Sequence, residues 1–184
     1  LLGDHDAIRR EAAALPGAFV RALVERLRAH PQGRRAVVPC RPVLQKHDAC
    51  LPSSLTTVLS GLGHAVDVDA LVRQLTFGGT ATWRATDWLA AQGYIVGQFI
   101  VTPPLARALL ADGLPFVLLF EWESNAHATA AIGYDEATDT LIVHDPSRSR
   151  WLRMRLEGIG ADEGPLGPRG LVIVRPEDAG RLAL

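Results

Sequence analysis

The chain has 184 residues, of which 48% are hydrophobic, a composition that suits one globular domain of ordinary size with a buried core. The balance of 19 Lys and Arg against 20 Asp and Glu argues against the basic surface that nucleic-acid binding requires. No apolar run approaches the roughly 20 residues that span a bilayer, and the first residues lack the pattern of a signal peptide. We therefore expect a soluble chain with no nucleic-acid partner, and its compartment stays open.

The N-terminal residues are predicted to form a helical hairpin. Residues 6–14 and 18–29 place apolar residues at helical spacing on either side of a Pro-Gly break. The apolar side chains of the second helix, such as Phe19 and Leu27, need a partner surface, which could be the main domain or another domain or protein. We therefore expect three parts: a hairpin extension (1–35), a main domain (36–178) and a tail (179–184).

The next predicted helix begins at a cysteine. Pro52 suits the first helical turn, where its missing N–H is harmless, and leucine and valine side chains follow at helical spacing until Gly61 and Gly63. A cysteine at a helix N-terminus lies beside unpaired backbone N–H groups and the positive end of the helix dipole, which favour the thiolate. Cys50 is therefore a candidate nucleophile. Gln45, five residues upstream, could donate its side-chain N–H to an oxyanion together with the backbone N–H of Cys50.

The chain contains only one other cysteine, Cys40, which lies in a proline-rich loop with no helix after it, and we interpret it as structural. Two cysteines are too few for a disulfide scaffold, and no Cys-x-x-Cys or clustered His/Cys spacing suggests a zinc site. We expect neither a metal nor another cofactor.

Beyond this helix the chain changes from helical to strand periodicity. Helices are expected from Asp67 or Asp69 to residue 75, over 82–92, and from 102 until Gly113, with a strand at 94–100 between the last two. Further strands are expected over 116–120, 127–134, 141–144, 151–156 and 170–175. Helices first and strands second indicate an α+β fold in which an antiparallel sheet packs against the helix that begins at Cys50.

Three residues are candidate walls of a substrate groove. Gly79 lies in a glycine pair between two predicted helices, where the absence of a side chain lets a loop pass close to a ligand. Trp83 and Trp122 are further candidate walls, although an aromatic residue such as Trp83 more often packs in the core.

His127 and Asp145 are the candidate base and acid. His127 starts one predicted strand, and Asp145 follows the end of the next. If these strands pair as a hairpin, the two side chains become neighbours. An imidazole oriented by an acid can take the thiol proton from Cys50 and later protonate the leaving amine.

These residues also resemble a known family, the bacteriocin-processing (double-glycine leader) peptidases and their stand-alone relatives among the papain-like cysteine peptidases. The similarity covers about residues 36–175 in family order. The matching segments are Gln45, Cys50-Leu51-Pro52-Ser53-Ser54-Leu55, His127, Ile132-Gly133-Tyr134-Asp135 and Val143-His144-Asp145-Pro146-Ser147. Leu51 stands where the family commonly has glycine.

The resemblance implies a papain-like fold, with Cys50 as nucleophile, His127 as base, Asp145 as orienting acid and Gln45 as oxyanion donor. It also implies a peptide or protein substrate and hydrolysis of a peptide or amide bond. The same triad serves acyl transfer or deamidation equally well. From a different class, the chain could be a catalytically silent binding or regulatory module that docks on partners through its helical hairpin.

Overall fold

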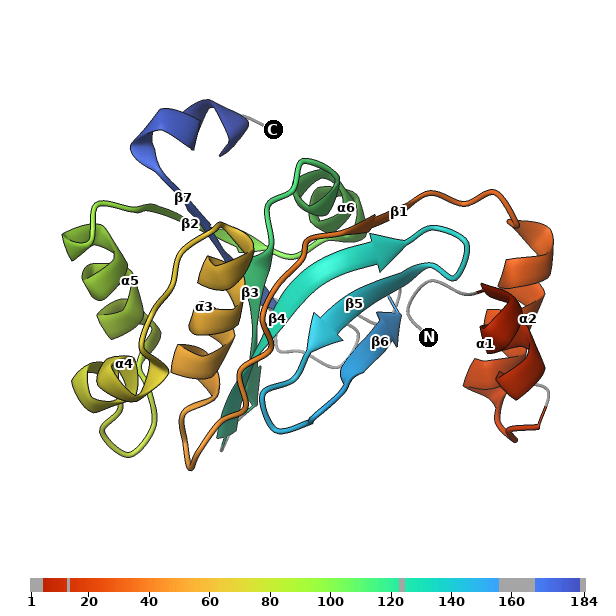
Figure 1. Ribbon diagram of the computed structural model, residues 1–184, viewed down its shortest axis with the longest axis horizontal. Helices are drawn as coiled ribbons and strands as arrows, with labels where there is room; N and C mark the ends of the chain where they lie inside the picture. The colour runs from red at the N-terminus through yellow and green to blue at the C-terminus, as the bar shows by residue number, and fades with distance from the viewer. Residues whose placement is uncertain (1–4, 13, 123–124, 156–167, 183–184) are drawn as a thin grey trace.

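The computed structural model describes residues 5–12, 14–122, 125–155 and 168–182 (Figure 1). The predicted hairpin is present as α1 (His5–Ala12) and α2 (Ala18–Ala29), which pack on each other. Leu27 of α2 is fully buried. Figure 1 shows the hairpin beside the turn that joins β4 to β5, at the opposite end of the molecule from α4 and α5.

Two ion pairs hold the hairpin against this turn. His5 Nε2 lies 3.0 Å from Oδ2 of the buried Asp135, and a guanidinium nitrogen of Arg26 lies 3.5 Å from Oδ2 of Asp139. A short strand, β1 (Arg35–Val37), then leads the chain into the sheet by pairing with β4. The expected boundary between residues 35 and 36 therefore lies within a strand of the sheet.

The sheet is antiparallel throughout, in the order β2-β7-β3-β4-β5-β6, with β1 added on β4. Its strands are β2 (Ile95–Ile100), β3 (Phe116–Trp122), β4 (Asn125–Asp135), β5 (Thr140–His144), β6 (Trp151–Arg155) and β7 (Arg169–Val174). β4 and β5 are neighbours in sequence and in space, with Ala130 opposite His144. This pairing confirms the predicted hairpin of the two strands, and it brings the start of β4 toward the end of β5.

Helices cover both faces of the sheet (Figure 1). One face packs against α3 (Cys50–Gly61), α4 (Val68–Leu75) and α5 (Thr82–Ala91), and the other packs against α6 (Pro103–Ala111). β3 shows how both faces are filled, because Val117 and Leu119 belong to the core under α3 whereas Phe116 and Leu118 belong to the core under α6. The alternation follows from the two-residue period of a strand.

Local sequence signals explain where several helices begin and end. Asp67 is the N-cap of α4 and accepts hydrogen bonds from the backbone N–H groups of Asp69 and Ala70, which decides between the two predicted caps.

The last described element is a short 3-10 helix, Pro176–Leu182, which includes the start of the expected tail. Arg181 Nε in this helix donates to Asp112 Oδ2 at the end of α6 (3.0 Å). No helix within the described ranges is long and apolar enough to span a membrane.

Candidate active site

Cys50 is the first residue of α3, as the sequence predicted. The turn before it contains Asp48 with a left-handed φ of 39°, followed by the buried N-cap residue Ala49. Burial by itself raises the pKa of the Cys50 thiol, but hydrogen bonds from His127 and from the backbone of Ala128 and Leu51 outweigh it, together with the charge of His127. The pKa of Cys50 is therefore below its ordinary value, which favours the thiolate.

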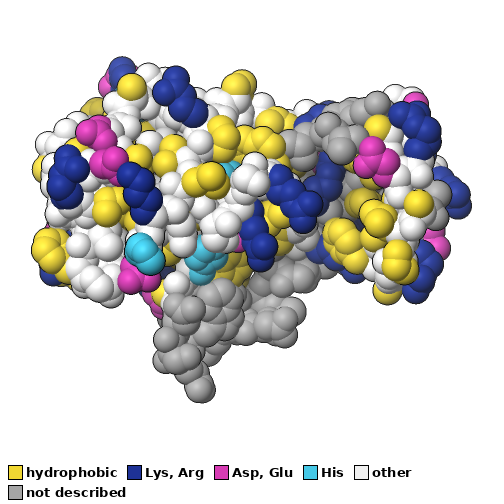
Figure 2. Space-filling view, turned by 60° about the horizontal axis from the view of Figure 1, so that its bottom comes forward, with side chains coloured by type: hydrophobic (Ala, Val, Ile, Leu, Met, Phe, Trp, Pro, Cys, Tyr) yellow, Lys and Arg dark blue, Asp and Glu magenta, His cyan; other side chains and the backbone are white. Residues whose placement is uncertain are grey.

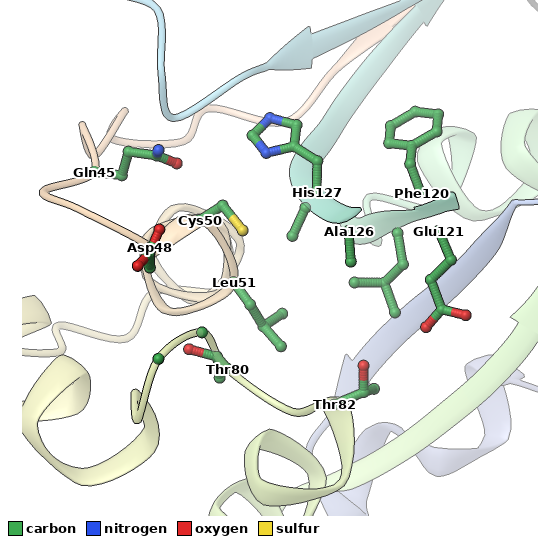
Figure 3. Close-up of a pocket in the computed structure, with 14 residues that line it drawn as sticks. Gln45, Asp48, Cys50, Leu51, Thr80, Thr82, Phe120, Glu121, Ala126 and His127 are labelled. Atoms are coloured by element: carbon green, nitrogen blue, oxygen red, sulfur yellow. The ribbon is translucent and has the colours of Figure 1, made fainter. Parts of the chain in front are cut away.

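His127 lies on β4 and points toward the same space as Cys50 (Figure 3). Its Nε2 donates a hydrogen bond to Asp145 Oδ1 (2.9 Å), which leaves Nδ1 for Cys50. The hydrogen bond with Cys50 raises the pKa of His127, burial acts in the opposite direction, and the hydrogen bond and charge of Asp145 raise it further. The net shift of the His127 pKa is upward, so its imidazolium form is stabilised. The thiolate form of Cys50 beside it is stabilised as well.

Asp145 is fixed by the residue two positions after it. The backbone N–H and the hydroxyl of Ser147 both donate to Asp145 Oδ1, at 2.9 and 2.7 Å. Burial raises the pKa of Asp145, but the two bonds from Ser147 and the contact with His127 lower it more, so the carboxylate stays ionised. No role was predicted for Ser147, although a serine two residues after an aspartate is a typical local turn signal.

Gln45 lies beside the cleft, facing the side on which Cys50 and His127 meet (Figure 3). Its backbone N–H donates to the carbonyl oxygen of Pro146 (2.9 Å), so its position is tied to the turn that contains Asp145. The side-chain Oε1 is buried and has no hydrogen-bond partner among the described residues. A half rotation of the amide exchanges oxygen and nitrogen, which puts an N–H donor at this unsatisfied position.

These side chains meet at an open cleft of about 500 Å³. One wall is the loop between α4 and α5, and the other is formed by the end of β3 and the start of β4. The lining residues are Gln45, Asp48, Cys50, Leu51, Gly78, Gly79, Thr80, Thr82, Leu119, Phe120, Glu121, Ala126, His127 and Ala128. Cys50 is partly exposed and lines this cleft.

The three candidate groove residues have different locations. Gly79 lines the cleft, with a left-handed φ of 106° and open space where a Cβ would stand. Trp83 is 59% exposed and is not among the described residues that line the cleft. The side chain of Trp122 lies outside the described part of the structure.

Residues 37–157, more than half of the sequence, match the family described as "Peptidase_C39 like family". The chain belongs to this family. The match begins within β1, after the helical hairpin. The predicted resemblance and the predicted enzyme class, a cysteine peptidase that hydrolyses peptide bonds, are confirmed.

Several solved structures share the fold, among them two peptidases. The peptidase domain of Streptococcus ComA, a bi-functional ABC transporter involved in a quorum sensing pathway, is 16% identical with a TM-score of 0.57, over 72% of this chain and 96% of that one. A double glycine motif protease from an AMS/PCAT transporter, solved in complex with the leader peptide, is 13% identical with a TM-score of 0.57, over 75% and 93%. No curated protein matches the chain. The predicted papain-like α+β fold is confirmed by these neighbours.

Proposed function

We propose that this Peptidase_C39-like protein cleaves a peptide substrate with Cys50 as the nucleophile, His127 as the general base and Asp145 as the acid that orients it. Gln45 is the oxyanion donor. The observation that supports the proposal best is the order of Cys50, His127 and Asp145 at the edge of an open cleft, in which His127 donates to Asp145 and lowers the pKa of the Cys50 thiol. This order is the one that a thiol, a base and an orienting acid need.

In the first step, the Cys50 thiolate attacks the carbonyl carbon of the scissile bond. A carbon–sulfur bond forms, and the carbonyl π electrons move to oxygen. The side-chain N–H of Gln45 and the backbone N–H of Cys50 donate to this oxyanion. The His127 imidazolium then gives its proton to the leaving amine as the carbon–nitrogen bond breaks, which leaves a thioester on Cys50.

In the second step, His127 takes a proton from water, and the resulting hydroxide attacks the thioester carbonyl. Breakdown of this second tetrahedral intermediate releases the carboxylic acid product and restores the thiolate. Asp145 keeps the imidazole in one orientation through both steps, because its carboxylate accepts the Nε2–H of His127 throughout.

A peptide substrate is supported by the open cleft and by the similar double glycine motif protease, which was solved with its leader peptide. The test is incubation of the purified chain with a library of proteome-derived peptides, followed by mass spectrometry of the products. We expect new termini from hydrolysis with the wild type and none with Cys50→Ala. Peptides that keep both halves but change in mass would instead indicate deamidation or acyl transfer at a side chain, and an acyl half joined to an acceptor amine would indicate acyl transfer at the backbone.

We also propose that residues 1–35 are an extension of the peptidase domain (36–178) that docks on another domain or protein. The hairpin lies outside the family match and keeps apolar side chains at its surface, with Leu15 58% exposed and Phe19 40% exposed. Figure 2 shows hydrophobic side chains gathered among Lys and Arg on this lobe. A variant that lacks residues 1–33 should retain cleavage of the library, since the hairpin contributes no residue to the lining of the cleft among the described residues.

A further inference from the structure

The cleft wall between α4 and α5 carries two exposed aromatic side chains on residues that adjoin its lining. Phe77 precedes Gly78 and is 67% exposed, and Trp83 follows Thr82 and is 59% exposed. They are the most exposed large hydrophobic residues in the described part of the chain. Their neighbours Gly78 and Thr82 line the cleft, so both aromatic residues belong to the segment that forms its wall.

Arg84 lies between the same two rings. Its guanidinium carbon is 4.3 Å from the centroid of the Phe77 ring and 5.2 Å from that of Trp83. Among the described residues, no carboxylate forms an ion pair with Arg84. A guanidinium that stacks on aromatic faces keeps its N–H edges free, and those edges match the two oxygens of a carboxylate.

The loop holds this group in place without a ligand. The hydroxyls of Thr76 and Thr80 are 2.8 Å apart across its base, and the backbone N–H of Phe77 donates to the carbonyl of Gly79 (2.9 Å). The backbone N–H of Arg84 donates to the carbonyl of Ala81 (3.1 Å). These bonds fix the backbone of the loop, and the contacts of Arg84 with both rings hold the three side chains together, which lowers the cost of ordering them on binding.

The surface formed by Phe77, Trp83 and Arg84 differs in charge from the cleft itself. Apart from His127, the charged residues that line the cleft are Asp48 and Glu121. Glu121 is paired with Arg169, so Asp48 is the charge that disfavours an acidic residue close to the scissile bond. Arg84 offers a positive charge just beyond the wall. We infer that Phe77, Trp83 and Arg84 form an aromatic-arginine subsite, which binds an acidic side chain of the peptide substrate outside the cleft. The inference rests on the proposed function in taking the ligand to be the substrate.

The test measures binding separately from cleavage. An array of proteome-derived peptides is made in pairs, in which one member has every Asp and Glu replaced by Asn and Gln, and is probed with the Cys50→Ala protein. We expect the acidic member to bind about two- to fivefold better in many pairs, the size of an ion pair at an exposed surface. Arg84→Gln in the same background should remove this preference, and Arg84→Glu should turn it against acidic members.

Arg73→Gln is the matched control, because Arg73 is an exposed arginine on α4 and its loss changes the net charge by the same amount. Equal binding of both members of the pairs, or an equal loss of preference in Arg73→Gln, would overturn the subsite. Peptides that bind there should also slow alkylation of Cys50 in the wild type, and binding without this protection would contradict a substrate subsite. Acidic peptides that bind and protect Cys50, yet are never cleaved, would support the subsite and refute the proposed hydrolysis.

Discussion

The backbone N–H of Gln45 donates a hydrogen bond to the carbonyl oxygen of Pro146, with 2.9 Å between nitrogen and oxygen. Pro146 directly follows Asp145. The segment that leads into the Cys50 helix and the turn after β5 are therefore joined by a main-chain hydrogen bond. A change in the turn at residues 145–147 should thus affect the orientation of His127 and the position of the oxyanion donor together.

Ser147→Ala tests this turn. The substitution removes the hydroxyl donor to Asp145 and leaves the backbone N–H bond in place. The pKa of Asp145 is lowered in the intact protein partly by this hydroxyl, so its loss should raise that pKa and move the acid limb of the activity profile to higher pH. We expect kcat/KM to fall roughly tenfold, from the loss of about 1.5 kcal/mol for a hydrogen bond to a charged group. Ser147→Thr should restore both properties, whereas an unchanged profile in Ser147→Ala would count against the positioning role.

Cys50→Ala should abolish cleavage of library peptides, because no other described side chain in the cleft can form the thioester. Asp145→Asn should retain residual activity, since the thiolate and the oxyanion donors survive while the imidazole loses its orienting acid. The expected loss in kcat is on the order of 10⁴, as for the orienting acid of a serine triad. Rates of product formation measure both, with circular dichroism as the check on folding. Full activity in either variant would exclude the assigned triad.

Gln45→Ala should lower kcat by about 2.7–4 kcal/mol of transition-state stabilisation and change substrate binding far less, because the oxyanion exists only after attack. Steady-state kinetics on a cleaved library peptide separates kcat from KM. Gln74→Ala, which removes an exposed glutamine of α4, is the control. If Gln45→Ala raised KM with kcat unchanged, Gln45 would be a substrate-binding residue and not an oxyanion donor.

The two cysteines provide a test that needs no substrate. Burial raises the pKa of Cys40 to about 12, whereas the pKa of Cys50 is below its ordinary value because the donors around it outweigh burial. At about pH 6, even a free thiol with a pKa of about 8.5 is ionised to well under one per cent. Brief treatment with iodoacetamide at this pH should therefore label Cys50 and spare Cys40, as determined by peptide mapping.

His127→Ala should move the onset of Cys50 labelling to more alkaline pH, because the mutation removes the hydrogen bond and the charge that favour the thiolate. Intrinsic nucleophilicity falls with the pKa of a thiol, but the gain in ionised fraction is larger. Slow and equal labelling of both cysteines in the folded protein would show that Cys50 is an ordinary thiol and would favour a silent binding module.

The ion pair between His5 and Asp135 predicts a difference in acid stability. Burial raises the pKa of Asp135, but the hydrogen bonds and charges of His5 and Arg153 lower it more, and the net shift is downward. Asp135 therefore stabilises the fold above its unfolded-state pKa of about 3.9, and this stability is lost as pH falls through the lower folded-state pKa. His5→Ala raises the folded-state pKa, so acid unfolding should begin at higher pH.

Circular dichroism during an acid titration measures this shift. His30→Ala is the control, because His30 is an exposed residue at the end of α2. Cleavage at neutral pH should be the same in His5→Ala and the wild type. An identical acid transition in the two proteins would mean that His5 does not affect the ionisation of Asp135.

The part of the site that depends on neighbouring segments of the chain could be predicted from the sequence. The approach of His127 to Asp145 follows from consecutive strands that pair as a hairpin, and the position of Cys50 follows from local helix signals. The place of β7 between β2 and β3 could not be predicted, because long segments of chain separate these strands and nothing local determines their order.

The tryptophans show a second limit. Trp83 and Trp88 are five positions apart on one helix, and the spacing alone does not tell which side chain is buried. In the structure Trp88 packs against the core, whereas Trp83 remains exposed beside Arg84. The role of Ser147 also could not be predicted, since its turn is visible in the sequence but the contact of His127 with the same oxygen of Asp145 is not.

The alternation along β3 links the two sides of the sheet in unfolding. Phe116 and Leu118 belong to one core, and Val117 and Leu119 belong to the other. Any two adjacent residues in this part of β3 therefore contribute one side chain to each core. Loss of either core frees a strand that the other core needs. The layers that pack on the two faces therefore lose their structure in one cooperative transition, and a half-melted state with only one intact core is not available to the peptidase domain.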